Sequence, residues 1–206
     1  MGLYNEKILP YLLDWSMAGP TLEHYRRNVL AEVSGEVLEI GFGTGLNLPY
    51  YPDYVRQIVT VDPSPGVHHL AQKRIEASPI AVEHHMLSSE ALPMADGTFD
   101  SVISTFTLCS IPNIEQALAE IHRVLKPGGR FFFVEHGLSH EPSIQTWQNW
   151  LTPLQKRIAG GCHINRNMRQ LIEQQFDQVE LEAAYAEKIP KVAGYFYQGV
   201  ATKRQP

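Results

Sequence analysis

The fold is decided by the stretch Val37-Leu38-Glu39-Ile40-Gly41-Phe42-Gly43-Thr44-Gly45-Leu46-Asn47. Its first four residues form a short apolar run that contains one acid, Glu39, and such a run predicts a buried parallel strand. Glycine then occupies every second position from Gly41 to Gly45. Glycines at the end of a strand let the chain turn sharply and bring bare backbone close to a ligand. The stretch therefore predicts a strand that ends in a ligand-binding glycine loop.

Two common glycine-loop motifs do not fit this stretch. The dinucleotide fingerprint G-x-G-x-x-G requires a glycine at the position of Leu46. The phosphate-binding loop G-x-x-x-x-G-K-[ST] requires a lysine after the last glycine, and none follows Gly45. The loop therefore indicates a nucleoside-like ligand without phosphates. A nicotinamide-dependent oxidoreductase remains as a less favoured alternative.

The rest of the chain alternates between strand and helix patterns. Strands are expected at residues 57–61, 80–85, 99–105, 130–135, 179–185 and 195–202, and helices at 3–18, 21–33, 65–77, 114–125 and 165–176. The run Lys126-Pro127-Gly128-Gly129 is expected to separate a helix from the strand after it. This alternation predicts an α/β fold with a mostly parallel sheet.

An acid stands at the end of the second predicted strand. Asp62 follows the glycines by about 20 residues, where a carboxylate accepts hydrogen bonds from both hydroxyls of a ribose. The alternative is that Asp62 caps the following helix. Ligands bind beyond the carboxyl ends of parallel strands, so residues 105–110, after the fourth strand, also belong near the reaction site.

Taken together, these signals resemble motif I and the later motifs of the class I S-adenosylmethionine-dependent methyltransferases. The joint pattern consists of the glycine loop, Asp62, Leu92-Pro93, Phe99-Asp100 and Leu125-Lys126-Pro127-Gly128-Gly129. The resemblance implies a Rossmann-like, seven-stranded, mostly parallel sheet with helices on both faces and an antiparallel last strand.

The same resemblance implies S-adenosyl-L-methionine as cofactor. Ser88 and Ser89 replace the acid–alanine pair that is more usual in this family. The resemblance therefore does not assign the hydrogen-bond donor and acceptor for the adenine. The implied cofactor-binding residues are Glu39, Gly41, Gly43, Gly45, Asn47, Asp62, Pro63, Ser64, Ser89, Glu90 and Thr105.

More narrowly, the chain is similar to the thiol S-methyltransferases of animal microsomes. The similar segments are Leu108-Cys109-Ser110, the run from Arg123 to Gly129, Glu135-His136 and Gly161-Cys162. The resemblance implies a methyltransferase that acts on a small, largely apolar acceptor, with a thiol as the leading candidate. A non-catalytic S-adenosylmethionine-binding protein stays open, because methyl transfer often needs no diagnostic catalytic residue.

Composition and charge limit the expected partners and cellular location of the protein. The chain of 206 residues has a formal net charge of −5, which gives no electrostatic reason to expect nucleic acid as a partner. Residues 1–17 lack the apolar core of a signal peptide, and no membrane anchor or membrane span is expected. Cys109 and Cys162 form neither a disulfide framework nor a metal-ligand spacing, so we expect no metal and a cytoplasmic location. Nothing in the sequence selects an oligomeric state.

The acceptor side of the site is predicted from position alone. Within a single domain, residues 1–34 are expected to form a helical cap and residues 137–163 a lid-like insertion. His136, directly after the fifth strand, is a candidate general base or a structural histidine. Cys109 is expected to line the pocket or to be buried, and Cys162 with His163 lacks the partners of a metal site. The aromatic walls of the pocket are expected to be Tyr11, Trp15, Phe106, Trp147 and Trp150.

Overall fold

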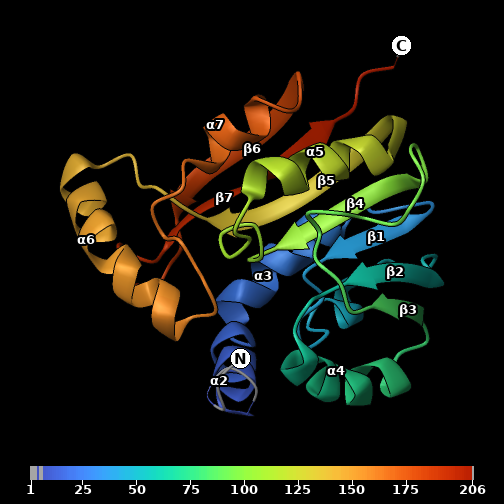
Figure 1. Cartoon of the computed structure of the whole chain (residues 1–206), viewed down its shortest axis with the longest axis horizontal. Coiled ribbons are helices and arrows are strands. Elements are labelled where there is room, and N and C mark those ends of the chain that lie inside the picture. Colours follow the sequence, from blue (N-terminus) through green and yellow to red (C-terminus); the bar gives the residue numbers. More distant parts are fainter. Residues whose placement is uncertain (1–3, 5–6, 206) are drawn as a thin grey trace.

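A seven-stranded sheet runs through the computed structural model, which describes Tyr4 and residues 7–205 (Figure 1). The strand order is β3-β2-β1-β4-β5-β7-β6. Neighbouring strands from β3 to β5 pair in parallel, whereas β7 pairs antiparallel with both β5 and β6. The predicted sheet is therefore confirmed. The strands are β1 Val37–Ile40, β2 Gln57–Val61, β3 Ala81–His85, β4 Phe99–Thr105, β5 Leu125–His136, β6 Gln178–Tyr185 and β7 Tyr195–Thr202.

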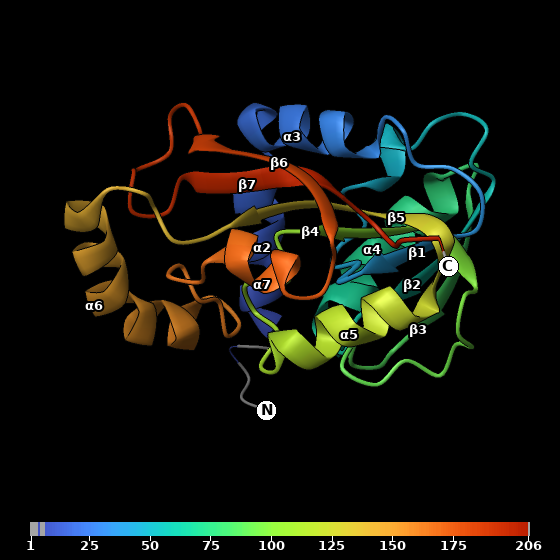
Figure 2. The ribbon, with the colours of Figure 1, turned by 90° about the horizontal axis from the view of Figure 1, so that it is seen from above.

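Helices cover both faces of the sheet (Figure 2). One face packs against α3, the short 3-10 helix η1 and α4, and the other packs against α5 and α7. The helices are α2 Leu9–Met17, α3 Pro20–Leu30, η1 Leu48–Tyr50, α4 Pro65–Ala77, α5 Ile114–Val124, α6 Pro142–Ile158 and α7 Met168–Glu173. The expected cap 1–34 includes residues 1–3 and 5–6, which lie outside the described residues.

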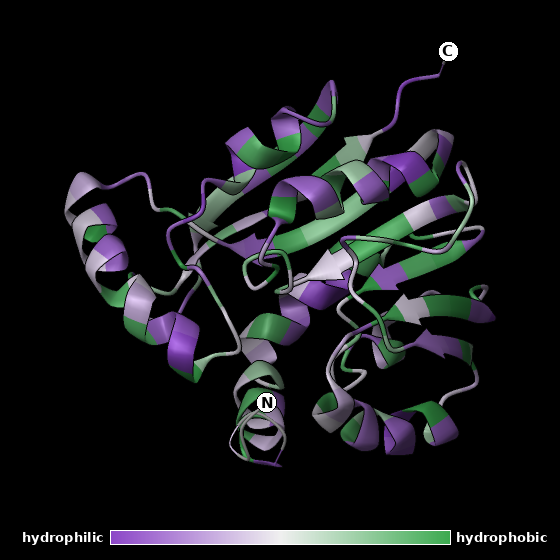
Figure 3. Cartoon of the chain, viewed as in Figure 1, coloured by the Kyte–Doolittle hydropathy of each residue, from purple (hydrophilic) through white to green (hydrophobic). Residues whose placement is uncertain are grey.

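Side-chain alternation along the central strands explains the two layers. In β5, Phe131 and Phe133 belong to the core beneath α5 and α7, whereas Phe132 and Val134 belong to the core beneath α3 and α4. Successive residues of a strand point to opposite faces, so a strand that is buried on both sides is apolar throughout. Figure 3 shows this as hydrophobic residues concentrated along β4 and β5.

The predicted break at residues 126–129 lies inside a strand. β5 begins at Leu125, which pairs with Phe99, and the next pair joins Ser101 to Arg130. The β5 chain thus advances by five residues while β4 advances by two. The Lys-Pro-Gly-Gly run is a bulge in β5, with Gly128 at a φ of 78°. α5 ends before this run, at Val124, as expected, but the strand starts at Leu125 and not at Arg130.

The expected insertion at residues 137–163 is mostly helical. α6 occupies Pro142–Ile158 and stands beyond the carboxyl ends of the parallel strands, away from the sheet (Figure 1). Pro142 lies in the first turn, where a missing N–H costs no helical hydrogen bond, and Pro153 lies inside the helix. Gln148 ties α6 down: its amide donates to the carbonyls of Gly137 and Val192 and accepts the N–H of Ser139.

Among the described residues, no helix is both long enough and apolar enough to cross a bilayer.

Candidate functional site

The glycine loop needs its glycines for two different reasons. Gly41, Gly43 and Gly45 have φ values of 72°, 56° and 78°, in the left-handed region that side chains disfavour. A Cβ on Gly41 would lie 2.1 Å from the side chain of Thr107, so this glycine allows a close approach of the loop to the end of β4. A Cβ on Gly43 would meet nothing nearer than the Gly41 carbonyl oxygen at 3.9 Å. The loop therefore leaves open space in front of Gly43.

Asp62 joins the end of β2 to this loop. Its Oδ2 accepts the N–H of Gly43 at 2.8 Å, and its Oδ1 accepts the N–H of Ser64 at 2.9 Å. Burial raises the pKa of Asp62, and the two N–H donors limit that rise. Asp62 does not cap α4, because Ser64 stands at the N-cap position. Each carboxylate oxygen accepts more than one hydrogen bond, so Asp62 keeps capacity for further donors.

A second network links β1, the loop and β4. Glu39 is only 1% exposed; its Oε1 accepts from Asn47 Nδ2 at 2.8 Å and its Oε2 from the Tyr51 hydroxyl at 2.6 Å. Asn47 Nδ2 also donates to Thr105 Oγ1 at 3.0 Å. Burial raises the pKa of Glu39 to about 7, although the hydrogen bonds from Tyr51 and Asn47 oppose the shift. Asn47 Oδ1 is buried and has no hydrogen-bond partner in the described part of the chain.

The residues after β3 are engaged mainly in holding a turn. Ser89 is buried, and the Glu90 carboxylate accepts the N–H of Asn113 at 2.6 Å and the hydroxyl of Ser88 at 3.0 Å. Asn113 is the N-cap of α5, as predicted. Pro63, between Asp62 and Ser64, is exposed. In this arrangement Glu90 fixes the entry to α5.

The turn after β4 is held in an unusual conformation by a buried acid. Phe106 has a φ of 54°, which is rare for a bulky side chain and occurs where surrounding contacts enforce it. Glu135, at 0% exposure, accepts the N–H groups of Thr107 at 2.8 Å and Leu108 at 2.9 Å, and the Ser104 hydroxyl. Burial raises the pKa of Glu135 to about 8. These bonds fix the path of residues 105–110 at the carboxyl end of the sheet.

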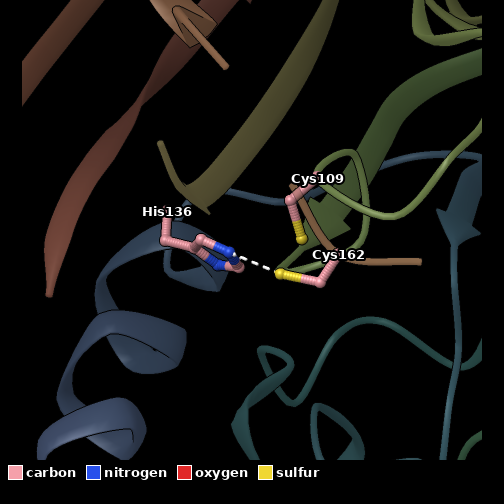
Figure 4. A group of neighbouring side chains, drawn as sticks. All are labelled: Cys109, His136 and Cys162. Atoms are coloured by element: carbon pink, nitrogen blue, oxygen red, sulfur yellow. Dashed lines mark hydrogen bonds between the residues drawn. The ribbon is translucent and has the colours of Figure 1, made fainter. Parts of the chain in front are cut away.

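Three sulfur and nitrogen side chains converge at this turn. The ligand atoms of Cys109, His136 and Cys162 all lie within 4.8 Å of one another, and we call these residues the Cys-His-Cys cluster (Figure 4). His136 Nε2 lies 2.8 Å from Cys162 Sγ. Both cysteines are buried, whereas His136 is partly exposed.

The cluster favours one ionised thiol. A hydrogen bond from the Cys162 thiol and the charge of His136 hold the pKa of Cys109 well below its usual range, against burial. Burial lowers the pKa of His136, but the negative charge at Cys109 outweighs it and raises the pKa overall. The hydrogen bond to Cys109, together with burial, raises the pKa of Cys162. Together these shifts favour ionisation of Cys109 over Cys162.

Backbone contacts hold the two cysteine-bearing segments together. The N–H of His163 donates to the Cys109 carbonyl at 2.9 Å. The Arg166 guanidinium donates to the carbonyls of Leu108 and Ile111. The His163 side chain lies outside the cluster, so the adjacent Cys162-His163 pair does not act as a unit. Sequence reasoning missed Arg166 entirely, and no local motif marks it.

The expected aromatic walls do not form an enclosed pocket. Trp15 on α2 is 82% exposed and Trp150 on α6 is 70% exposed, and Tyr11 and Trp147 are each 57% exposed. Trp147 and Trp150 stack edge to face with each other. Phe106 alone of the five packs inward, against Phe196. The other four side chains face solvent in this structure, and their role as walls of the acceptor pocket stays a prediction.

Comparison with known proteins places this geometry in a family. The family description "Methyltransferase domain" matches residues 38–133. Thiol S-methyltransferase TMT1B of Rattus norvegicus is 35% identical over 189 residues, which cover 84% of this chain and 77% of the relative. Thiol S-methyltransferase TMT1A of Homo sapiens is 34% identical over 71% of this chain and 62% of the relative. A solved structure of Haemonchus contortus phosphoethanolamine N-methyltransferase 2, in complex with S-adenosyl-L-methionine, has a TM-score of 0.74 at 15% identity, covering 98% of this chain and 59% of that one.

The fold, the glycine loop and these relatives define a class I S-adenosylmethionine-dependent methyltransferase, and within that class the chain belongs to the family of the TMT1 relatives. It is an enzyme, and its cofactor is S-adenosyl-L-methionine. The predicted enzyme class and cofactor are thereby confirmed. The nicotinamide alternative finds no support, since the family match and both relatives are methyltransferases.

Proposed function

We propose that the chain methylates the sulfur of a small, largely apolar thiol. The observation that carries this proposal is the extent of the similarity to thiol S-methyltransferase TMT1B. That similarity covers 84% of the chain, whereas the general methyltransferase-domain match is confined to residues 38–133. It therefore includes much of the sequence outside the cofactor-binding half, where the acceptor specificity of such an enzyme resides.

We propose that the cofactor lies along the glycine loop. When bound, S-adenosylmethionine supplies a methyl group on a positively charged sulfur. Open space at Gly43 supports the fit, because a cofactor there meets backbone without a side chain in the way. Asp62 offers acceptor oxygens for the ribose hydroxyls. The unpartnered Oδ1 of Asn47 is the acceptor that an ammonium group would satisfy.

The other expected cofactor-binding residues have different roles in this proposal. Glu39 and Thr105 position Asn47 from beneath the loop through its amide nitrogen. Gly41 and Gly45 shape the loop, and Ser64 and Pro63 continue the chain from Asp62. Ser89 and Glu90 line the turn after β3, which we assign to the adenine side.

We propose that the acceptor binds at the Cys-His-Cys cluster. The Thr107 hydroxyl donates to the Gly41 carbonyl at 3.3 Å, so the turn that carries Cys109 touches the cofactor loop. β4 lies between β1 and β5, and adjacent strands are about 4.8 Å apart. The cluster and the glycine loop therefore lie close together at the carboxyl ends of these neighbouring strands. A thiol suits this position, because its thiolate is the nucleophile and a thiol near its free pKa is already partly ionised. A hydroxyl or amine would require a stronger base than this cluster contains.

We propose that residues 1–34 act as a cap and residues 137–163 as a lid on the acceptor within one methyltransferase domain. α2 and α6 both stand beyond the carboxyl ends of the strands (Figure 1). Their exposed aromatic side chains provide apolar surface that a small apolar acceptor can cover. Gln148 anchors α6 near its middle through the carbonyls of Gly137 and Val192.

We further propose a cytoplasmic setting and no nucleic-acid partner. Both cysteines are free, and a reducing compartment keeps neighbouring thiols in that state. The net charge of −5 does not favour a polyanion.

The experiment that tests the proposed function compares matched acceptors. The purified chain is incubated with S-adenosylmethionine and either an aryl thiol or the phenol of the same shape. S-adenosylhomocysteine and the methylated product are measured by mass spectrometry. We expect a methyl thioether from the thiol and little or no methyl ether from the phenol. Turnover of the phenol alone would overturn the thiol assignment.

A further inference from the structure

The Cys-His-Cys cluster has the composition of a metal site. Cysteine sulfur and histidine nitrogen are the preferred ligands of zinc, and two cysteines with one histidine form a known catalytic zinc set that leaves the fourth position open. Here the three ligand atoms converge from the turn after β4, the end of β5 and the loop after α6. Each ligand residue thus belongs to a different segment of the fold, and all three point toward one another (Figure 4).

The spacing of the three atoms also suits a tetrahedral metal. Zinc–sulfur and zinc–nitrogen bonds of about 2.3 Å and 2.0–2.1 Å separate neighbouring ligand atoms by roughly 3.6–3.8 Å. The three atoms lie within 4.8 Å of one another, and His136 Nε2 is 2.8 Å from Cys162 Sγ. A metal at their centre therefore requires His136 Nε2 and Cys162 Sγ to move apart by less than about 1 Å, and a pair at the 4.8 Å limit to approach by about 1 Å.

Hydrogen bonds around the cluster fix the segments that carry its ligand residues. The buried Glu135 accepts N–H groups from the turn that carries Cys109, and Arg166 donates to carbonyls of the same turn. His163 bonds to the Cys109 carbonyl and so joins the segment of Cys162 to it. Metal ligands in proteins are commonly held by such outer contacts.

We propose that Cys109, His136 and Cys162 bind a zinc ion and that its open fourth position takes the sulfur of the acceptor thiol. The second half of this proposal rests on the proposed function. It assigns a ligand role to His136 in place of a general-base role. It also replaces the expectation of no metal, which rested on the absence of a short ligand spacing along the sequence.

The metal explains how a thiol is activated in a buried site. A coordinated thiol loses its proton to water and stays as thiolate, because the metal stabilises the negative charge. The electron pair of that sulfur forms the new bond to the methyl carbon. The bond from this carbon to the cofactor sulfur breaks, its electron pair stays on the cofactor sulfur, and the products are a neutral thioether and S-adenosylhomocysteine. No oxidant or reductant is consumed.

A disulfide between the two cysteines is the competing arrangement. It would leave His136 without a role in the cluster, and it would remove both sulfur ligands. A disulfide is also disfavoured in a reducing compartment.

The first measurement is metal content. The full chain, without an affinity tag that binds metals, is loaded with zinc, dialysed and analysed by mass spectrometry for metals. We expect about one zinc per chain from a single three-ligand site. Cys109→Ala, Cys162→Ser and His136→Ala should each lose affinity by more than the roughly 10–100-fold that loss of an outer contact causes. The matched control is His140→Ala, an exposed histidine of the same segment, which should keep the zinc.

The second measurement uses cobalt in place of zinc in the wild-type chain and needs no variant to fold. The chain contains only two cysteines, so any thiolate-to-cobalt absorption band without added thiol comes from the cluster. Addition of an aryl thiol should change this band, and addition of the matching phenol should not. Absence of bound metal, metal binding that survives Cys109→Ala with Cys162→Ala, or a disulfide in freshly reduced chain would each overturn the metal site.

The outcomes separate this inference from the proposed function. Methylation of thiols by a chain that binds no zinc would overturn the metal site and leave the proposed function standing. A cobalt absorption band that does not change when thiol is added would overturn binding of the acceptor sulfur at the fourth coordination position. A band that responds to thiols in a chain that methylates none would support the metal site and contradict the proposed function.

Discussion

The Nε2 atom of His136 lies 2.8 Å from the Sγ atom of Cys162, although 26 residues separate them along the chain. His136 ends a central strand, and Cys162 follows the helix α6 that stands away from the sheet. This contact therefore ties the segment after α6 to the carboxyl edge of the sheet, next to the turn that carries Cys109. The proposed reaction site depends on this contact between His136 and Cys162.

Asp62 should contribute to cofactor affinity through its carboxylate. Replacing it by Ala removes an acceptor for ribose hydroxyls, and loss of a hydrogen bond to a charged group costs about 1.5–3 kcal/mol. Asp62→Asn keeps one acceptor oxygen and should lose less. Affinity for S-adenosylmethionine is measured by calorimetry, with the exposed Asp53→Ala as control. A folded Asp62→Ala chain of unchanged affinity would remove Asp62 from the cofactor site.

Gly41 and Gly43 should respond differently to the same substitution. A Cβ at Gly41 lies 2.1 Å from the Thr107 side chain, so Gly41→Ala should destabilise the fold by overpacking, typically about 1–3 kcal/mol. A Cβ at Gly43 enters open space, so Gly43→Ala should cost only the left-handed backbone, about 1–2 kcal/mol, while lowering cofactor affinity more strongly. Gly43→Val, with a larger side chain, should lower it further. Chemical denaturation and calorimetry on each variant separate the two effects, and equal cofactor affinity in Gly43→Ala and the wild type would contradict the placement of the cofactor.

Glu39 should make stability depend on pH. Its pKa is raised by burial from 4.5 in the unfolded chain to about 7 in the fold. Between these values the folded state binds more protons than the unfolded state, so stability falls as pH rises from about 4.5 to 7, by an amount on the order of 3 kcal/mol. Glu39→Gln should flatten this part of the profile, measured by urea denaturation at several pH values. Glu135, with a pKa of about 8, adds a fall in the same direction that persists in the variant. An unchanged slope in Glu39→Gln would show that Glu39 is ionised in the fold at low pH.

Trp147 and Trp150 should matter for the acceptor and not for the fold. Both side chains are mostly exposed, so the double replacement by Ala should change the free energy of unfolding by no more than about 0.5 kcal/mol. If α6 closes over an apolar acceptor, the KM for the thiol should rise while cofactor affinity stays constant. Lys156→Ala on the same helix is the matched control. Deletion of residues 141–159 behind a short Gly/Ser bridge should abolish thiol turnover and leave cofactor binding intact, and full turnover after that deletion would limit α6 to a structural role.

The parts of the fold that the sequence predicted depend on local periodicity. The glycines follow the short apolar run of β1 directly, and Asp62 follows them at a distance typical of the family. Their role could therefore be predicted from the sequence. The helix α5 was predicted because its apolar residues recur at helical spacing after the cap Asn113. α6 was missed because Pro142 and Pro153 suggest a broken chain. One of them occupies the first helical turn and the other is tolerated within the helix.

The Cys-His-Cys cluster could not be predicted from spacing. Sequence motifs for metal sites rely on ligands a few residues apart, whereas here Cys109 and Cys162 come from opposite ends of a segment that includes β5 and α6. Only the pairing of β4 with β5 and the return of the chain after α6 bring these side chains together. The exposure of Trp15 and Trp150 was likewise unpredictable, because it depends on which way a helix without a complete partner surface faces.

A competition among acceptors tests the central claim most directly. The chain is given S-adenosylmethionine with an isotope-labelled methyl group and an equimolar mixture of an aryl thiol, the corresponding phenol and the corresponding amine, and the labelled products are measured by mass spectrometry. The account predicts that the label appears in the methyl thioether, in step with S-adenosylhomocysteine. Label found in the methyl ether or the methylamine, with the thiol left unmethylated, would contradict it.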